Sequence, residues 1–229
     1  EHFFHLASTG DAVPLCAGCR EFNANRISAD AGYIAAVKDM TDADALTLLL
    51  ESCALDDLAG NLITQGNKSL PRKSVVEFGW VVGVPEITTT DSYFHVKYAS
   101  ERSQGQRDAD SEEEARGANL GQAIFHRPAS SGVYAAVANL ELARIGLNDI
   151  TQRYAVSDAD RGVRHAKLLE SLLYTFLEPN GAMRSTQNPH VVGLEGVITV
   201  SHAPLPAPSV SAINQEFDAQ LARICAALD

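Results

Sequence analysis

Two cysteines near the start of the sequence have the spacing of a metal-binding or redox pair. Cys16 and Cys19 form the motif CAGC, and His2 and His5 precede it. Residues three apart on a helix share a face, so the two histidines could point the same way. The four side chains make a plausible tetrahedral zinc set. The alternative is a surface turn after Pro14 with cysteines as small apolar residues, and a single CxxC motif leaves both readings open.

An adjacent acidic pair is the second candidate for chemistry. Asp56 and Asp57 follow a helical pattern and stand near its expected C-terminus, where negative charge is unfavourable. Two such carboxylates could hold a metal ion, or they could belong to a solvated turn. The sequence contains no G-x-S-x-G, P-loop or G-x-G-x-x-G motif, so we predict no catalytic residue and no cofactor.

A basic run stands out because the chain as a whole is acidic. The formal net charge is −11, yet no acidic residue occurs from residue 58 to residue 76. Lys68, Arg72 and Lys73 lie in that run together with the small polar Ser69. Lysine and arginine can neutralise phosphates, and small polar side chains leave the backbone accessible. The alternative is a solvated basic loop without a ligand.

A second acid-free stretch, PNGAMRSTQNPHVVGL at residues 179–194, contains Arg184 and Ser185. Two such stretches in an acidic chain favour a localised nucleic-acid surface. The acidic remainder would repel nucleic acid elsewhere and sharpen where it docks. Non-specific binding by the whole surface is disfavoured by the same negative charge.

Composition is that of an ordinary globular protein. The 229 residues are 45% hydrophobic and 21% charged, which suffices for a core in one or two domains. We expect a soluble, cytoplasmic protein, because no membrane-length apolar run, signal peptide or disulfide framework is visible. The sequence begins inside a helical pattern, so we also expect a preceding N-terminal piece.

Hydrophobic periodicity predicts the elements that must position these residues. Helices are expected over 41–55, capped by Thr41, over 157–178, capped by Ser157, and from about Ser209 onward. Strands are expected over 74–85, 92–100, 131–147 and 190–201, with a glycine-containing loop or loose hairpin near 56–68. This order predicts one α+β domain on an antiparallel sheet, with a ferredoxin-like or RRM-like arrangement as the natural candidate.

The succession of several segments resembles a known family. LPRKSVVEFGWVVGVPE precedes YFHVKYAS, GQAIFHRPASSGVYAAVANLEL, a helix and GAMRSTQNPHVVGLEGVITVSHAPLPAPS. In this order, over residues 56–209, they resemble the DevR-type branch of the Cas-seven family. Those proteins are backbone subunits of type I CRISPR interference complexes (Cascade), and types I-B and I-A look closest. No segment is diagnostic alone.

The resemblance implies a modified RRM palm with an antiparallel sheet, a helical insertion and a protruding thumb hairpin. Residues 1–229 would form one domain, with the helical insertion at 1–55, the thumb at 56–74 and the palm at 75–229. The first palm strand would precede Glu1. The CAGC segment and the acidic loop around Glu113 depart from the family pattern.

The resemblance also implies a non-enzymatic subunit that binds guide RNA (crRNA) and stacks with further copies of itself. It would join other Cascade subunits and meet target DNA through the guide heteroduplex, without contacting a membrane. Contacts to phosphates and sugars suit a subunit that must accept any guide. The predicted RNA-binding residues are Lys68, Ser69, Arg72, Lys73, Gln122, Arg184 and Ser185.

Two alternatives stay open at this point. Related backbone subunits of type III complexes cut bound target RNA with a thumb aspartate, and Asp56 or Asp57 with a divalent metal would be the counterpart here. The other alternative is a zinc-stabilised interaction module centred on CAGC.

Overall fold

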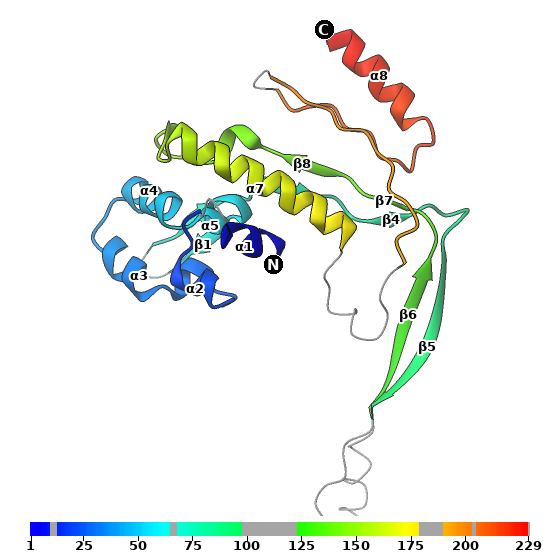
Figure 1. The fold of residues 1–229 in the computed structure, drawn as a ribbon, viewed down its shortest axis with the longest axis horizontal. Coiled ribbons are helices and arrows are strands. Elements are labelled where there is room, and N and C mark those ends of the chain that lie inside the picture. The colour runs from blue at the N-terminus through cyan, green and yellow to red at the C-terminus, as the bar shows by residue number, and fades with distance from the viewer. Residues whose placement is uncertain (10–12, 65–67, 98–122, 179–189, 203–204, 229) are drawn as a thin grey trace, which may run out of the picture. The chain divides into compact units, whose positions relative to one another are not determined.

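The computed structural model describes residues 1–9, 13–64, 68–97, 123–178, 190–202 and 205–228 (Figure 1). Helices and short antiparallel ladders make the fold α+β, as predicted. The chain forms two compact units, one of Glu1–Gly79 with Ala138–Val200 and one of Trp80–Val137 with Ser201–Asp229. These boundaries differ from the expected ones at 55 and 74, and the division into insertion, thumb and palm stays a prediction.

The N-terminal part of the first unit is helical. It contains α1 (His2–Ala7), α2 (Ala17–Arg20), a 3-10 turn (Arg26–Ala29), α3 (Ala31–Val37), α4 (Asp42–Ser52) and α5 (Ala54–Ala59). The capping prediction for α4 is confirmed, because Thr41 Oγ1 accepts a hydrogen bond from the Asp44 N–H at 3.2 Å. Leu46, Leu49 and Leu50 form the buried face of this helix, in the spacing that the sequence predicted.

A break between α4 and α5 corrects the expectation for the acidic pair. Cys53 has extended backbone angles, φ −146° and ψ 111°, and a new helix begins at Ala54. Asp56 and Asp57 therefore lie in the first turn of α5 and not at a helix C-terminus. A helix N-terminus favours negative charge, so the predicted electrostatic penalty is absent.

The expected hairpin is present directly after α5. β1 (Asn61–Ile63) pairs antiparallel with β2 (Leu70–Arg72), and Asn61 lies opposite Arg72. Ile63 is fully buried and Leu70 is 2% exposed, so both belong to the hydrophobic core. The paired part of this hairpin is thus embedded among the helices, in contrast to a thumb that protrudes along its whole length.

The rest of the first unit contains short strand pairs, a 3-10 turn and one long helix. β3 (Val76–Phe78) pairs with β8 (Ala138–Leu140), β9 (Leu147–Asn148) pairs with β10 (Arg153–Tyr154), and a 3-10 turn spans Leu142–Arg144. The helix α7 (Asp158–Leu177) begins as predicted, since Ser157 Oγ accepts from the Asp160 N–H at 3.2 Å. α1 packs against α7 (Figure 1).

The second unit contains the longest ladder. β5 (Thr89–Lys97) and β6 (Ala123–Ser131) pair over their full lengths and form the long hairpin of Figure 1. β5 confirms the strand expected over 92–100 as far as Lys97, and residues 98–100 lie outside the described part of the chain. β4 (Val82–Gly83) pairs with β7 (Tyr134–Ala135), and α8 (Phe217–Leu228) begins later than the expected position near 209.

Three strand predictions are wrong in extent. The stretch 131–147 is divided into β7, β8 and the 3-10 turn, and 74–85 is divided into β3 and β4. The cause at 142–144 is a turn held by Arg144, whose side chain bonds Glu141 and Asp149. No strand is assigned over 190–200, where Gly193 and Gly196 weaken strand formation.

The described strands pair only two by two, so the four-stranded RRM-like sheet stays a prediction. Within the same residues, no helix combines the length and apolarity that a membrane crossing requires.

Candidate functional site

A buried ionic network holds the base of the β1–β2 hairpin. Asp57 on α5 is fully buried, and its Oδ1 accepts from Arg72 Nη2 at 2.6 Å. Its Oδ2 accepts from Arg164 Nη1 at 2.7 Å and from the Gly146 N–H at 2.9 Å. A buried charge is costly unless it is paired and hydrogen-bonded, and Asp57 meets both conditions. One carboxylate thus ties α5, β2, α7 and the segment before β9 together.

Arg72 has no donor left for an external ligand. Its Nε donates to the Asp57 carbonyl, its Nη1 to the Leu147 carbonyl and Asp149 Oδ2, and its Nη2 to Asp57 Oδ1 and the Arg144 carbonyl. A guanidinium has five N–H donors, and all five are used. The structure therefore gives no support to the predicted contact between Arg72 and an RNA phosphate, which stays a prediction. Side chains alternate between buried and exposed along β2, and Arg72 is on the buried side, where it contacts the Asp57 carboxylate.

Asp149 extends the network toward the surface. Partial burial favours its neutral form, but the hydrogen bonds and charges of Arg144 and Arg72 outweigh that effect and lower its pKa. The network contains three guanidiniums and three carboxylates, so its formal charges cancel. Its members are Arg72, Arg144, Arg164, Asp57, Asp149 and Glu141. Such a set stabilises the fold and offers little attraction to a phosphate.

The two lysines of the basic run differ in access. Lys68 Nζ donates to the Met40 carbonyl at 2.7 Å and to Asp42 Oδ1 at 3.0 Å, and its side chain is only 10% exposed. Lys73 is 60% exposed, and its hydrogen bond with Glu77 raises its pKa. A solvated ion pair of this kind is weak, so a phosphate can displace Glu77 at small cost. Ser69 is exposed between the two lysines.

The other predicted contacts, Gln122, Arg184 and Ser185, lie outside the described residues. Their roles, and the proximity of the two acid-free stretches, stay predictions.

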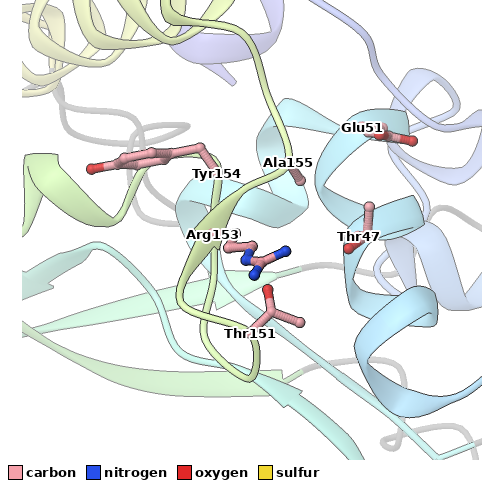
Figure 2. A pocket seen from close by; sticks show the side chains of 6 residues that line it. All are labelled: Thr47, Glu51, Thr151, Arg153, Tyr154 and Ala155. Atoms are coloured by element: carbon pink, nitrogen blue, oxygen red, sulfur yellow. The ribbon is translucent and has the colours of Figure 1, made fainter.

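An arginine that sequence reasoning missed occupies an open pocket of about 560 Å³. The pocket is lined by Thr47 and Glu51 of α4 and by Thr151, Arg153, Tyr154 and Ala155. Figure 2 shows the Arg153 guanidinium between Thr151 and Thr47, with the Glu51 carboxylate turned away from it. Arg153 is exposed and forms no ion pair with the residues that the structure describes. Its neighbourhood in the sequence contains acids, so composition gave no signal for it.

The burial of Asp56 and Asp57 bears on the alternative of RNA cleavage. Both side chains are 0% exposed. Asp56 Oδ1 accepts from Asn61 Nδ2 at 2.6 Å, and Asp57 is saturated by the network described above. Neither carboxylate reaches the surface at which an RNA strand would lie, so neither gains support as a catalytic residue.

The two histidines near the N-terminus have partners other than Cys16 and Cys19. His2 Nε2 bonds the Glu178 carbonyl at 3.0 Å, and His5 lies 4.0 Å from Glu1. Cys16 and Cys19 turn into the core, where burial raises the pKa of Cys16 to about 12. There their thiols contact Asp56 and Cys53 of the α4–α5 junction.

A protein-family model described as CRISPR-associated negative auto-regulator DevR/Csa2 matches residues 1–220. The matched range includes the first unit with the hairpin, the ionic network and the CAGC segment, and the second unit as far as residue 220. Among curated proteins, no match was found.

Proposed function

Because this chain belongs to the DevR/Csa2 family of CRISPR-associated proteins, we propose that it is a backbone subunit that binds crRNA. Several copies would stack along one guide within a type I Cascade complex of the I-B or I-A lineage. Target DNA would be reached through pairing with the guide, and the subunit itself would perform no chemistry. This role fits the antiviral defence in which CRISPR-associated proteins act.

The observation that supports RNA binding most directly is the accessible Arg153 in its open polar pocket. A guanidinium without a carboxylate partner can neutralise a phosphate, and the hydroxyls of Thr47 and Thr151 can bond phosphate or ribose oxygens. Lys73 supplies a second exposed cation on the same unit. Contacts of this kind hold a backbone without reading bases, which a subunit serving any guide requires.

Exposed apolar side chains support assembly with other chains. Trp80 is 91% exposed, Phe94 67%, Val192 99% and Ile198 91%. Monomeric proteins seldom leave such groups uncovered in number, and contacts between neighbouring subunits would cover them.

Removing either Arg153 or Lys73 should weaken guide binding in a salt-dependent way. Arg153→Ala and Lys73→Ala should each reduce the slope of log affinity against log salt by about 0.7, the value for one lost contact to single-stranded nucleic acid. Two guides of unrelated sequence should be affected equally, because phosphates carry no sequence information. Fluorescence anisotropy across a salt series measures both quantities.

Arg223→Ala is the matched control, because Arg223 is an exposed arginine on α8. It removes the same charge from a helix of the other unit. An Arg153→Ala protein that unfolds at the same urea concentration as the wild type and retains the wild-type salt slope would contradict the assignment of Arg153.

A further inference from the structure

Three cysteines and one aspartate from separate stretches of the sequence meet in the core of the first unit. Cys16 is the N-cap of α2 and Cys19 lies within it, Cys53 separates α4 from α5, and Asp56 lies in the first turn of α5. All four are buried, none more than 4% exposed. Their potential ligand atoms, three sulfurs and a carboxylate oxygen, all lie within 4.8 Å of one another.

The distances within this cluster are those of a tetrahedral metal site. Cys19 Sγ lies 3.6 Å from Cys53 Sγ, and Asp56 Oδ2 lies 3.5 Å from each of Cys16 Sγ and Cys19 Sγ. Zinc binds sulfur at about 2.3 Å and carboxylate oxygen at about 2.0 Å, so tetrahedral angles separate two sulfurs by about 3.8 Å and a sulfur from an oxygen by about 3.5 Å. These three distances match the two spacings to within a few tenths of an ångström, and the other three pairs of ligand atoms lie within 4.8 Å.

The two carboxylate oxygens of Asp56 have different surroundings. Oδ1 accepts from Asn61 Nδ2 at 2.6 Å and lies 3.6 Å from Arg26 Nε. Among the described residues, the partners of Oδ2 are the thiols of Cys16 and Cys19. A thiol is a weak donor, so thiols compensate poorly for the burial of a carboxylate oxygen. A cation between Oδ2 and the sulfurs would supply the missing compensation.

We propose that Cys16, Cys19, Cys53 and Asp56 bind a structural zinc ion. Four protein ligands complete a tetrahedral shell and leave no position for water or substrate, which is the arrangement of a structural site. Thiolates select zinc over magnesium or calcium, which prefer oxygen ligands.

Surrounding groups support the ligands as an outer shell. Asn61 orients the Asp56 carboxylate, Arg26 offsets part of the negative charge, and the Cys19 N–H donates to Cys16 Sγ at 3.4 Å. Gly18 allows the CAGC turn to lie against the chain near Arg26, because a Cβ at position 18 would stand 2.0 Å from the Arg26 carbonyl oxygen. The loop that presents two of the ligands is therefore fixed by backbone packing.

The position of Asp56 connects the metal to the hairpin. Asp56 and Asp57 are consecutive on α5, and Asp57 holds Arg72 of β2 and Arg164 of α7. Zinc bound through Asp56 would fix the same helical turn from its other side. The ion would thereby stabilise the base of the hairpin and bind neither RNA nor substrate, which sets this site apart from the proposed RNA surface.

Metal analysis of the full-length protein, purified without chelator, tests the proposal. Inductively coupled plasma mass spectrometry should find about one zinc ion per chain, and Cys53→Ser should lose most of it. Cys225→Ser and His2→Ala/His5→Ala should keep it, because Cys225 and the two histidines lie outside the cluster. Equal zinc content in Cys53→Ser and Cys225→Ser would overturn the assignment.

Cobalt substitution of the wild-type protein avoids dependence on a variant that fails to fold. Protein unfolded with a chelator and refolded with cobalt(II) should show thiolate-to-cobalt charge-transfer absorption and the visible bands of tetrahedral cobalt. Absence of these bands in refolded protein would overturn the proposal. So would a Cys19–Cys53 disulfide in freshly purified, zinc-free protein.

Discussion

Asp57→Ala should lower the free energy of unfolding by about 3–5 kcal/mol. The substitution leaves Arg72 and Arg164, whose side chains are 0% and 1% exposed, without the carboxylate they share. Removing one partner of a buried pair is costly because the remaining charge stays buried and uncompensated. This cost falls mainly on Arg164, since Arg72 keeps its ion pair with Asp149. A typical domain is stable by only about 5–15 kcal/mol, so this loss would remove a large part of its stability.

Urea denaturation followed by circular dichroism measures this effect. Asp158→Ala is the control, since Asp158 pairs with Arg161 but is 94% exposed, and its removal should change stability by less than about 0.5 kcal/mol. If Asp57→Ala and Asp158→Ala had similar unfolding free energies, the network would not be the anchor of the hairpin.

Gly60→Ala should destabilise the protein by about 2–4 kcal/mol, the combined cost of backbone strain and overpacking. Gly60 joins α5 to β1 with φ +71° and ψ 164°, a conformation open almost only to glycine. A Cβ there would stand 2.4 Å from the Arg72 carbonyl oxygen and 2.5 Å from the Ser74 nitrogen. Both atoms belong to the backbone, so they cannot turn aside as a flexible side chain would.

Gly162→Ala provides a control of opposite sign. Gly162 is an exposed position inside α7, and a Cβ there would meet nothing within 4 Å. Alanine is the better helix former, so this change should stabilise the protein by about 0.5–1 kcal/mol. The unfolding temperatures of the two variants should therefore shift in opposite directions from that of the wild type. A Gly60→Ala protein as stable as the wild type would mean that the α5–β1 connection has another conformation.

Local sequence signals predicted the elements that depend on local physics. The caps at Thr41 and Ser157, the apolar face of α4 and the strand β5 all follow from residue type and spacing within one element. The fold class followed from the order of these elements. The division of 131–147 could not be predicted in this way, because the turn at 142–144 depends on hydrogen bonds from Arg144 to a carboxylate and a backbone carbonyl of other segments.

The partners of Arg72 and of the CAGC cysteines were also missed because they come from distant segments of the chain. Arg72 looked accessible because its own segment lacks acids, but its partners Asp57 and Asp149 come from elsewhere in the chain. The cysteines of CAGC were matched with nearby histidines, whereas Cys53 and Asp56 lie 34 and 40 residues away from Cys19 and Cys16. Residue spacing cannot show which distant side chains the core brings together.

The nucleic acid that accompanies the purified protein tests the proposed role most directly. The protein would be isolated from cells that also express a CRISPR array, and the bound nucleic acid would be extracted, sized and sequenced, with the number of protein chains per strand measured by native mass spectrometry. We expect RNA of discrete length that carries array-derived guide sequence, with several protein chains on each strand. Protein free of RNA, or bound to RNA of random length and origin, would contradict a guide-binding backbone subunit.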